Sequence, residues 1–366
     1  MKHELKVITV LGYIILLSSF GYLAFTEDWP SAGQWALQAS LLWEFVLWQI
    51  DAHLSLNRSH DGAPLYQTLG WGNRLTILRG LLIAMTGGFI LFPHGKDFND
   101  LLPALFYSIA AFLDRFDGYA ARKSKQVSLL GDELDISFDA LGLVIAPLLA
   151  ISLDRLHPSY LLLSVAFYIY RWGLQYRSQR KLTRVTPPAN TVRRTLAGFQ
   201  MALLALILWP VFEPAFTQRL GIAFMLPVLF GFIVDWCIVC GWLTPKFVIS
   251  FDRVSYNYFQ PCLRGLLVVL LVIMARKLNL LDSLKHLSVL LVLLVVCSLN
   301  LILFGIAGRL GALIGLLCVG VYFDHLPSAI LSSSLLFTLS WLLLLGTGRF
   351  SVWQWDDDWV KRYEGA

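Results

Sequence analysis

The sequence predicts an all-α polytopic membrane protein. Of its 366 residues, 57% are hydrophobic and only 14% are charged, and the mean hydropathy is +0.66. Apolar runs long enough to cross a bilayer recur along the chain, and helices can cross it because they satisfy their own backbone hydrogen bonds. The net charge of +5 does not indicate nucleic-acid binding, because basic residues of such proteins gather on cytoplasmic loops.

Two apolar segments, about residues 6–25 and 34–50, predict an N-terminal transmembrane hairpin within residues 1–60. Lys2 and Lys6 precede the first segment, whereas residues 27–30 between the segments carry no Lys or Arg. This distribution places the N-terminus in the cytoplasm. A cleaved signal peptide is the competing interpretation, but the apolar run is long and the residues around Gly21 form a poor cleavage site, which favours a retained helix.

Six further spans predict a core domain within residues 61–247. They cover about residues 76–93, 101–119, 134–153, 158–175, 196–213 and 220–242. A basic loop with Arg122, Lys123 and Lys125 follows the second of these spans, which indicates that this end of the core faces the cytoplasm.

The most informative stretch of the core lies between Asp114 and Asp139. Asp114 and Asp117 are three residues apart, and Asp135 and Asp139 are four apart, so each pair projects from one face of its helix. Two such faces set against each other would hold four carboxylates around one point. Four like charges at a membrane boundary require cations, and dense oxygen ligands suit Mg²⁺ or Mn²⁺.

The same stretch resembles the signature of the CDP-alcohol phosphotransferase family, D-x2-D-G-x2-A-R-x8-G-x3-D-x3-D. Every fixed position is filled, by Asp114, Asp117, Gly118, Ala121, Arg122, Gly131, Asp135 and Asp139. A solvated acidic patch at a helix end is the plain alternative, but it does not explain the glycines, the alanine and the arginine. The resemblance implies a six-helix core, a CDP-linked donor, release of CMP and a homodimer.

An alcohol that attacks a pyrophosphate needs metal ions to neutralise the phosphoryl oxygens and a base to take the hydroxyl proton. Asp114, Asp117 and Asp135 are the expected ligands of Mg²⁺ or Mn²⁺, with two ions expected in the site. The resemblance implies that Asp139 is the catalytic base and that it also contacts the second metal ion.

A second element, Asn73-Arg-Leu-Thr76-Ile-Leu-Arg79, resembles the P-N-x-L-T-x2-R motif that opens the family's first core helix. Gly72 replaces the usual proline, which predicts a looser helix start. An ordinary interfacial helix cap with a long basic side chain is the alternative. The residues expected at the nucleotide and its phosphates are Asn73, Thr76, Arg79, Gly118, Ala121, Arg122 and Gly131.

A basic segment at residues 171–194 contains no acidic residue. A cytoplasmic loop that follows the positive-inside rule would explain it. The sharper hypothesis is that some of its arginines bind an anionic headgroup or an acceptor phosphate. The candidates for acceptor binding are Arg177, Arg180, Arg184, Arg193 and Arg194.

Four more apolar spans, about 262–275, 287–305, 308–323 and 327–346, follow a polar and aromatic connector at 246–264. This region, residues 248–366, resembles the four-helix DoxX-type membrane proteins, whose last helix runs into a G-x-G-[RK]-[YF]-S segment, here Gly346 to Ser351. The total of about twelve spans places both termini in the cytoplasm.

The resemblance implies an integral membrane enzyme of the cell inner membrane, with a cytoplasmic active site, that acts in phospholipid biosynthesis. A site in the bilayer favours CDP-diacylglycerol as the donor of a phosphatidyl group and a small polar alcohol as the acceptor. Two alternatives stay open. One is transfer of a phospho-amino-alcohol from a soluble CDP donor to a diglyceride, and the other is a non-catalytic or redox-linked membrane subunit with vestigial aspartates. A vestigial site predicts lost ligands, and no aspartate is missing.

Overall fold

The computed structural model describes residues 1–93, 98–188, 191–277, 289–323, 326 and 328–356. Within these ranges the named elements are helices. One isolated β-bridge pairs Ile306 with Trp353. Among the described residues, four helices are long and apolar enough to cross a membrane, namely Lys2–Thr26, Leu129–Ser152, Pro214–Val239 and Lys246–Lys277. Shorter apolar helices occupy four of the other expected spans, at Thr195–Leu208, Val289–Phe304, Gly308–Val321 and Ala329–Leu345. The prediction of an all-α polytopic membrane protein is confirmed.

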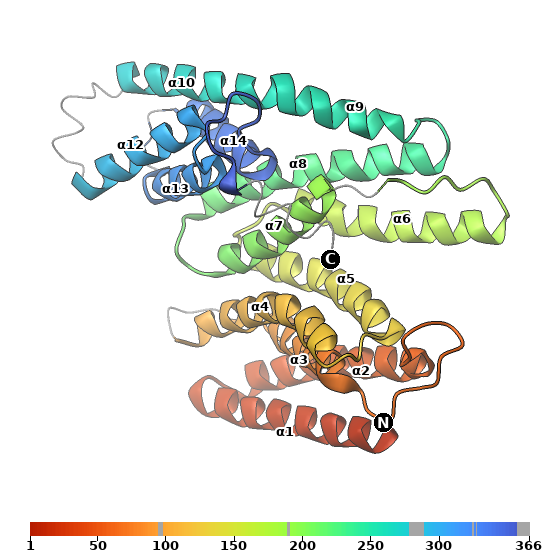
Figure 1. Ribbon diagram of the computed structural model, residues 1–366. Coiled ribbons are helices and arrows are strands. Elements are labelled where there is room, and N and C mark those ends of the chain that lie inside the picture. Colours follow the sequence, from red (N-terminus) through yellow and green to blue (C-terminus); the bar gives the residue numbers. More distant parts are fainter. Residues whose placement is uncertain (94–97, 189–190, 278–288, 324–325, 327, 357–366) are drawn as a thin grey trace. The chain divides into compact units, whose positions relative to one another are not determined.

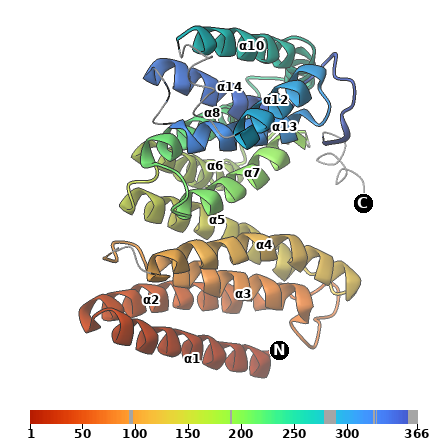
Figure 2. The same ribbon diagram turned by 90° about the vertical axis from the view of Figure 1, so that its left-hand side faces the viewer.

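The first of two compact units comprises Met1–Arg155 and Met201–Pro210. It contains α1 (Lys2–Thr26), α2 (Trp29–His53), α3 (Gly70–Gly87), α4 (Leu102–Lys123), α5 (Leu129–Ser152) and the end of α7 (Thr191–Leu208). In Figures 1 and 2, α1 to α4 follow one another in space in chain order. Helix α3 packs against α2, α4 and α5 and therefore lies at the centre of the unit.

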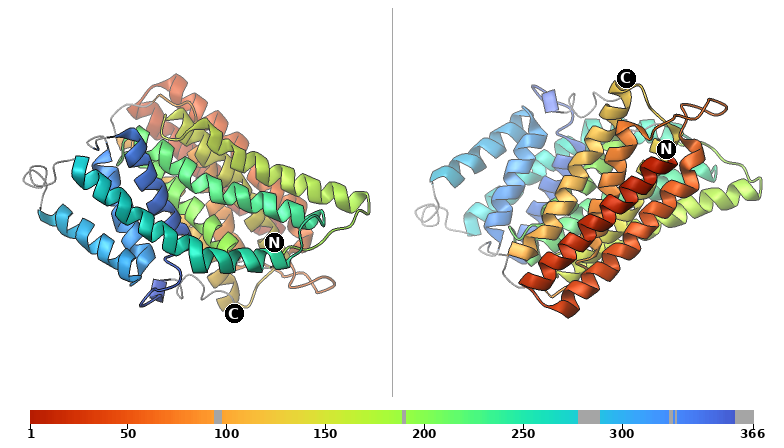
Figure 3. Two further views of the ribbon diagram at one scale, coloured as in Figure 1. Left: turned by 90° about the horizontal axis from the view of Figure 1, so that it is seen from above. Right: turned by 90° about the horizontal axis from the view of Figure 1, so that it is seen from below.

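The N-terminal hairpin of α1 and α2 is held together by large aromatic side chains. Asp28 caps α2 by accepting a hydrogen bond from the Ser31 backbone N–H at 2.8 Å. Trp35 and Trp43 of α2 are fully buried, and Gly12 of α1 faces the Trp43 ring so closely that it has no room for a side chain. The two helices run side by side along their length (Figure 3).

Helix α3 approaches its neighbours closely because glycines lie at its contacts. A Cβ atom at Gly80 would lie 2.9 Å from Val46 of α2 and 3.0 Å from Phe138 of α5. Small residues allow helices to approach closely in a membrane protein and thereby increase packing contacts. Because α3 touches three helices at once, side chains that leave it on different faces meet residues from each of them.

The turn between α4 and α5 is tighter than the sequence suggested. Helix α4 extends to Lys123, so Arg122 and Lys123 belong to its last turn and not to a loop. Ser128 caps α5, because its Oγ accepts a hydrogen bond from the Gly131 backbone N–H at 3.1 Å. The two helices that carry the aspartates are therefore joined by only a few residues.

The second unit comprises Leu156–Gln200 and Val211–Ala366. Its helices are α6 (Leu161–Gln179), α8 (Pro214–Val239), α9 (Lys246–Val254), a π-helical turn (Ser255–Phe259), α10 (Gln260–Lys277), α12 (Val289–Phe304), α13 (Gly308–Val321) and α14 (Ala329–Leu345). Helix α14 packs against α8, α10 and α13, and Trp341 donates a hydrogen bond to the Ala223 carbonyl oxygen at 3.0 Å.

The segment 246–264, expected as a polar connector, is helical. It forms α9, the π-helical turn and the start of α10 as one run of 32 residues from Lys246 to Lys277. The C-terminal helices thus share a packed unit with α8, which belongs to the predicted core. The proposed domain limits and the DoxX-type resemblance stay predictions.

Candidate active site

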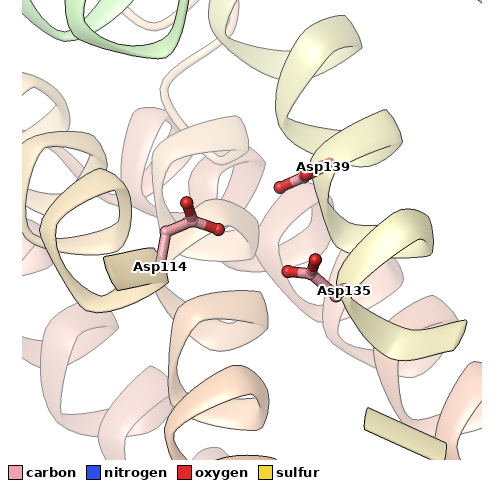
Figure 4. A group of neighbouring side chains, drawn as sticks. All are labelled: Asp114, Asp135 and Asp139. Carbon is pink, nitrogen blue, oxygen red and sulfur yellow. The ribbon is translucent and has the colours of Figure 1, made fainter. Parts of the chain in front are cut away.

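Four aspartates from two helices surround one arginine from a third. Asp114 and Asp117 lie on α4, Asp135 and Asp139 on α5, and Arg79 reaches them from α3. Figure 4 shows the carboxylates of Asp114, Asp135 and Asp139 pointing toward a common centre. The structure therefore brings together the two carboxylate pairs that helical spacing predicted.

The Arg79 guanidinium contacts each carboxylate. Its Nη1 donates to Asp114 Oδ1 and lies 3.5 Å from Asp117 Oδ2. Its Nη2 donates to Asp135 Oδ1 at 2.9 Å, to the Asp135 carbonyl oxygen at 3.2 Å and to Asp139 Oδ1 at 3.1 Å. The Arg79 side chain is only 1% exposed. Sequence reasoning placed Arg79 among the residues at the nucleotide and its phosphates, whereas the structure buries it between the carboxylates.

The charges of this cluster do not balance. Four carboxylates against one guanidinium leave a formal charge of −3, and unpaired charge is costly at a site that is partly removed from water. Oxygens of Asp114, Asp135 and Asp139 lie within 4.8 Å of one another. Opposite ligands of an octahedral Mg²⁺ are about 4.2 Å apart, from a bond length of about 2.1 Å. Donor type, charge and spacing therefore fit a divalent cation.

The four carboxylates differ in their access to solvent. The Asp135 and Asp139 side chains are 48% and 44% exposed, whereas Asp114 and Asp117 are 23% and 11% exposed. Asp117 is also the most enclosed by hydrogen bonds, because it accepts one from Thr76 Oγ1 at 3.0 Å and one from the Gly118 N–H at 2.6 Å. An entering molecule thus meets the two carboxylates of α5 first.

Asn73 is buried, and its side chain forms hydrogen bonds with other residues of the protein. Its Nδ2 lies within hydrogen-bonding distance of the Leu69 carbonyl oxygen at 2.8 Å, Ser128 Oγ at 3.1 Å and Asn57 Oδ1 at 3.2 Å. These contacts favour a positioning role between α3 and the start of α5. The expected nucleotide contact of Asn73 stays a prediction, as does that of the buried Thr76.

Packing accounts for several small residues of the signature. A Cβ atom at Gly131 would lie 2.8 Å from Asn73 Oδ1, and one at Gly118 would lie 3.3 Å from Arg122 Nη1. Gly131 therefore leaves room for Asn73, and Arg122 folds back over Gly118. Ala121 lies against Gly72 at the contact between α4 and α3. Roles for these four signature residues at the nucleotide stay predictions.

The basic segment belongs to the second unit. Arg177 is held locally, because its guanidinium donates to the Thr183 carbonyl oxygen and lies 3.5 Å from Cys240 Sγ. Arg180 lies over the Tyr176 ring and is exposed, as is Arg184. The side chains of Arg193 and Arg194 lie outside the described residues. Acceptor binding by these arginines stays a prediction.

Sequence reasoning missed the residues that support the site. Ser128 caps the helix of Asp135, Asn57 bonds to Asn73, and Glu4 bonds to the start of α3. Ser128 had a local signal, since a serine three residues before a helical N–H is a common cap. No local sequence pattern marked Asn57 or Glu4, because their partners lie far along the chain.

Comparison with known proteins supplies an independent observation. The family model described as CDP-alcohol phosphatidyltransferase matches residues 71–245. The chain is 34% identical over 193 residues to the CDP-diacylglycerol–glycerol-3-phosphate 3-phosphatidyltransferase of Rickettsia bellii (strain RML369-C). That alignment covers 52% of this chain and 93% of the relative. No solved structure gives a significant match.

Proposed function

Because the chain belongs to the CDP-alcohol phosphatidyltransferase family, we propose that it transfers a phosphatidyl group from CDP-diacylglycerol to a small polar alcohol. The observation that carries the proposal is the set of four aspartates on α4 and α5 around Arg79. The complete set argues against a vestigial site, because a protein that had lost the chemistry would have no need to hold four carboxylates together.

The reaction assigns each carboxylate a task. The acceptor hydroxyl oxygen forms a bond to the phosphorus that carries the diacylglycerol, the bond from that phosphorus to CMP breaks, and CMP leaves with the electron pair. Asp139 takes the hydroxyl proton, and its exposed side chain is reachable by an acceptor. Asp114, Asp117 and Asp135, with Asp139 at the edge, would hold one or two Mg²⁺ or Mn²⁺ ions. When bound, such ions neutralise the phosphoryl oxygens during transfer.

Arg79 has a different task from the one its sequence motif suggested. Its Nη1 and Nη2 groups are directed at the carboxylates, and its Nε is buried without a hydrogen-bond partner among the described residues. A guanidinium committed to four aspartates orients them, and it reduces their mutual repulsion. We assign Arg79 to carboxylate positioning, with phosphate binding left to Arg122.

Glycerol 3-phosphate is the acceptor that we propose first. The Rickettsia relative is described as acting on it, and the basic segment of this chain offers exposed arginines suited to an anionic acceptor. The membrane context supports a lipid donor, because four helices in the described part of the chain are long and apolar enough to span a bilayer. We place the site on the cytoplasmic side from the Lys and Arg distribution, and a homodimer stays a prediction.

An assay of CMP release tests the proposal. Purified full-length protein receives either CDP-diacylglycerol or a soluble CDP-amino-alcohol with diglyceride, each with Mg²⁺ and with EDTA. Acceptors in the first arm are glycerol 3-phosphate, glycerol, serine and inositol. We expect CMP release with CDP-diacylglycerol and glycerol 3-phosphate, abolished by EDTA. Release from the soluble donor alone would show the alternative reaction, and release that EDTA leaves unchanged would contradict the metal assignment.

A further inference from the structure

We propose that Glu4, in the N-terminal helix α1, is a positioning residue for the aspartate site. Glu4 lies outside residues 71–245, the part that matches the family. It nevertheless contacts the helix that carries Arg79. The inference rests on the proposed function only for its kinetic readout, because its metal-binding readout stands alone.

Glu4 binds the start of α3 at two points. Its Oε2 accepts a hydrogen bond from the Leu69 backbone N–H at 3.0 Å. Its Oε1 accepts from Arg74 Nε at 2.7 Å and lies 2.6 Å from Arg74 Nη2. Figure 3 shows the beginning of α1, marked N, beside the loop that leads from α2 to α3.

These contacts supply a cap that α3 lacks. Its N-cap residue is Leu69, which has no side chain able to accept a hydrogen bond. The first N–H groups of a helix have no partner inside the helix, and a carboxylate near them also interacts favourably with the helix dipole. In a capping box an acidic side chain of the same helix accepts the N-cap N–H. Here Glu4 accepts it from a separate helix.

The first turn of α3 is connected directly to the α5 helix start. Asn73 follows one turn after Leu69 and contacts Ser128 Oγ, which in turn caps α5 at Gly131. Asn73 also contacts the fully buried Asn57, which bonds to the Thr68 carbonyl oxygen at 2.9 Å. The polar contacts therefore run without a gap from Glu4 to the helix that carries Asp135 and Asp139.

The same helix carries the residues that orient the carboxylates. Thr76 lies one turn beyond the first turn of α3 and donates a hydrogen bond to Asp117. Arg79 lies one turn further and contacts all four carboxylates. The close contact of Gly72 with Ala121 leaves little room for α3 to slide along α4. A shift of the first turn of α3 therefore also moves Thr76 and Arg79, and it changes the positions of the aspartates that they contact.

The experiment compares Glu4→Gln with a matched control in the full-length protein. Glu4→Gln keeps the size of the side chain and removes its charge. The control, Glu44→Gln, removes another carboxylate of the hairpin, whose partner Tyr13 lies on α1 and not on α3. Mn²⁺ affinity is measured by electron paramagnetic resonance without substrates, alongside kcat, KM for the donor and the unfolding temperature.

We expect Glu4→Gln to weaken Mn²⁺ binding and lower kcat by about threefold to tenfold, below the roughly 10- to 100-fold typical of groups that contact a metal ligand directly. Glu44→Gln should leave both unchanged. Arg74→Gln should cause a smaller loss than Glu4→Gln, because Glu4 still accepts the hydrogen bond of the Leu69 N–H, and the double variant should be no worse than Glu4→Gln.

Two results would overturn the inference. In the first, Glu4→Gln keeps the Mn²⁺ affinity and the kcat of the wild type and only its unfolding temperature falls, which would make the contact merely structural. The other is equal losses in the Glu44→Gln control. A wild-type protein that binds Mn²⁺ but releases no CMP would instead contradict the proposed reaction, and the effect of Glu4→Gln on Mn²⁺ binding would still decide this inference.

Discussion

Gly72 of α3 lies directly against Ala121 of α4. A Cβ atom at residue 72 would lie 2.7 Å from the Ala121 Cβ and 3.0 Å from the Asp117 carbonyl oxygen. Gly72 stands where the family usually has proline, and the sequence alone suggested a looser helix start. The structure shows instead a close contact beside an aspartate of the site.

The first prediction concerns this contact. We expect Gly72→Ala to reduce the free energy of unfolding by about 1 to 3 kcal/mol, the usual cost of overpacking. It should also lower CMP release, because α4 must move away from α3 together with Asp117. Gly33→Ala is the control, since a Cβ atom there would meet nothing within 4 Å. Thermal unfolding and CMP release measure both effects, and equal behaviour of the two variants would contradict the packing argument.

The second prediction concerns the positive charge inside the cluster. Arg79→Gln leaves four carboxylates without their shared partner, and breaking a buried ion pair typically costs about 3 to 5 kcal/mol. We expect a large loss of stability in EDTA that Mg²⁺ partly restores, because bound cations replace the lost charge. Unfolding temperatures with EDTA and with Mg²⁺ test this.

The control for that experiment is the exposed Arg253 of α9. Arg253→Gln should show the same small Mg²⁺ effect as the wild type. A Mg²⁺ effect in Arg79→Gln that is no larger than in this control would show that Arg79 and the cations do not share the carboxylates.

The third prediction separates the metal ligands from the base. Asp114→Asn and Asp135→Asn should abolish both Mn²⁺ binding and turnover. Asp139→Asn should slow CMP release by about 10²- to 10⁴-fold, the usual contribution of a general base, while donor binding is largely kept. Donor binding and single-turnover CMP release measure the difference. Loss of donor binding in Asp139→Asn would make Asp139 primarily a metal ligand.

The fourth prediction concerns the acceptor. Arg184 is exposed, whereas Arg177 is held by the Thr183 carbonyl oxygen. We expect Arg184→Gln to raise KM for glycerol 3-phosphate by about tenfold or more, as for the loss of a charge-assisted hydrogen bond of about 1.5 to 3 kcal/mol. KM for the donor should not change. Arg177→Gln should chiefly lower stability, and a parallel rise of both KM values in Arg184→Gln would argue against a specific acceptor contact.

Sequence reasoning found the parts of the site that follow a local rule. Helical spacing predicted that Asp114 pairs with Asp117 and Asp135 with Asp139, and the structure places each pair on one helix. The depth of Arg79 could not be predicted, because it depends on how closely Gly72 and Gly80 let α3 approach its neighbours.

The contact of Glu4 with Leu69 was equally hidden from sequence reasoning. Its two residues are 65 positions apart, and helix periodicity carries no information about which helices become neighbours. The same limit applies to Trp341 and Ala223, whose hydrogen bond joins the C-terminal helices to α8. Division of the chain at residue 248 rested on the polar connector and on the DoxX-type resemblance, and neither registers that contact.

The arginine at the centre of the carboxylates has a consequence for how the protein is made. A metal site that consisted of four aspartates alone would repel itself until cations arrived, so membrane insertion and helix assembly would depend on metal supply. Arg79 provides a resident positive charge that every newly made chain carries. The helices that carry the aspartates can therefore come together around Arg79, and their assembly depends less on bound cations than it would with the aspartates alone.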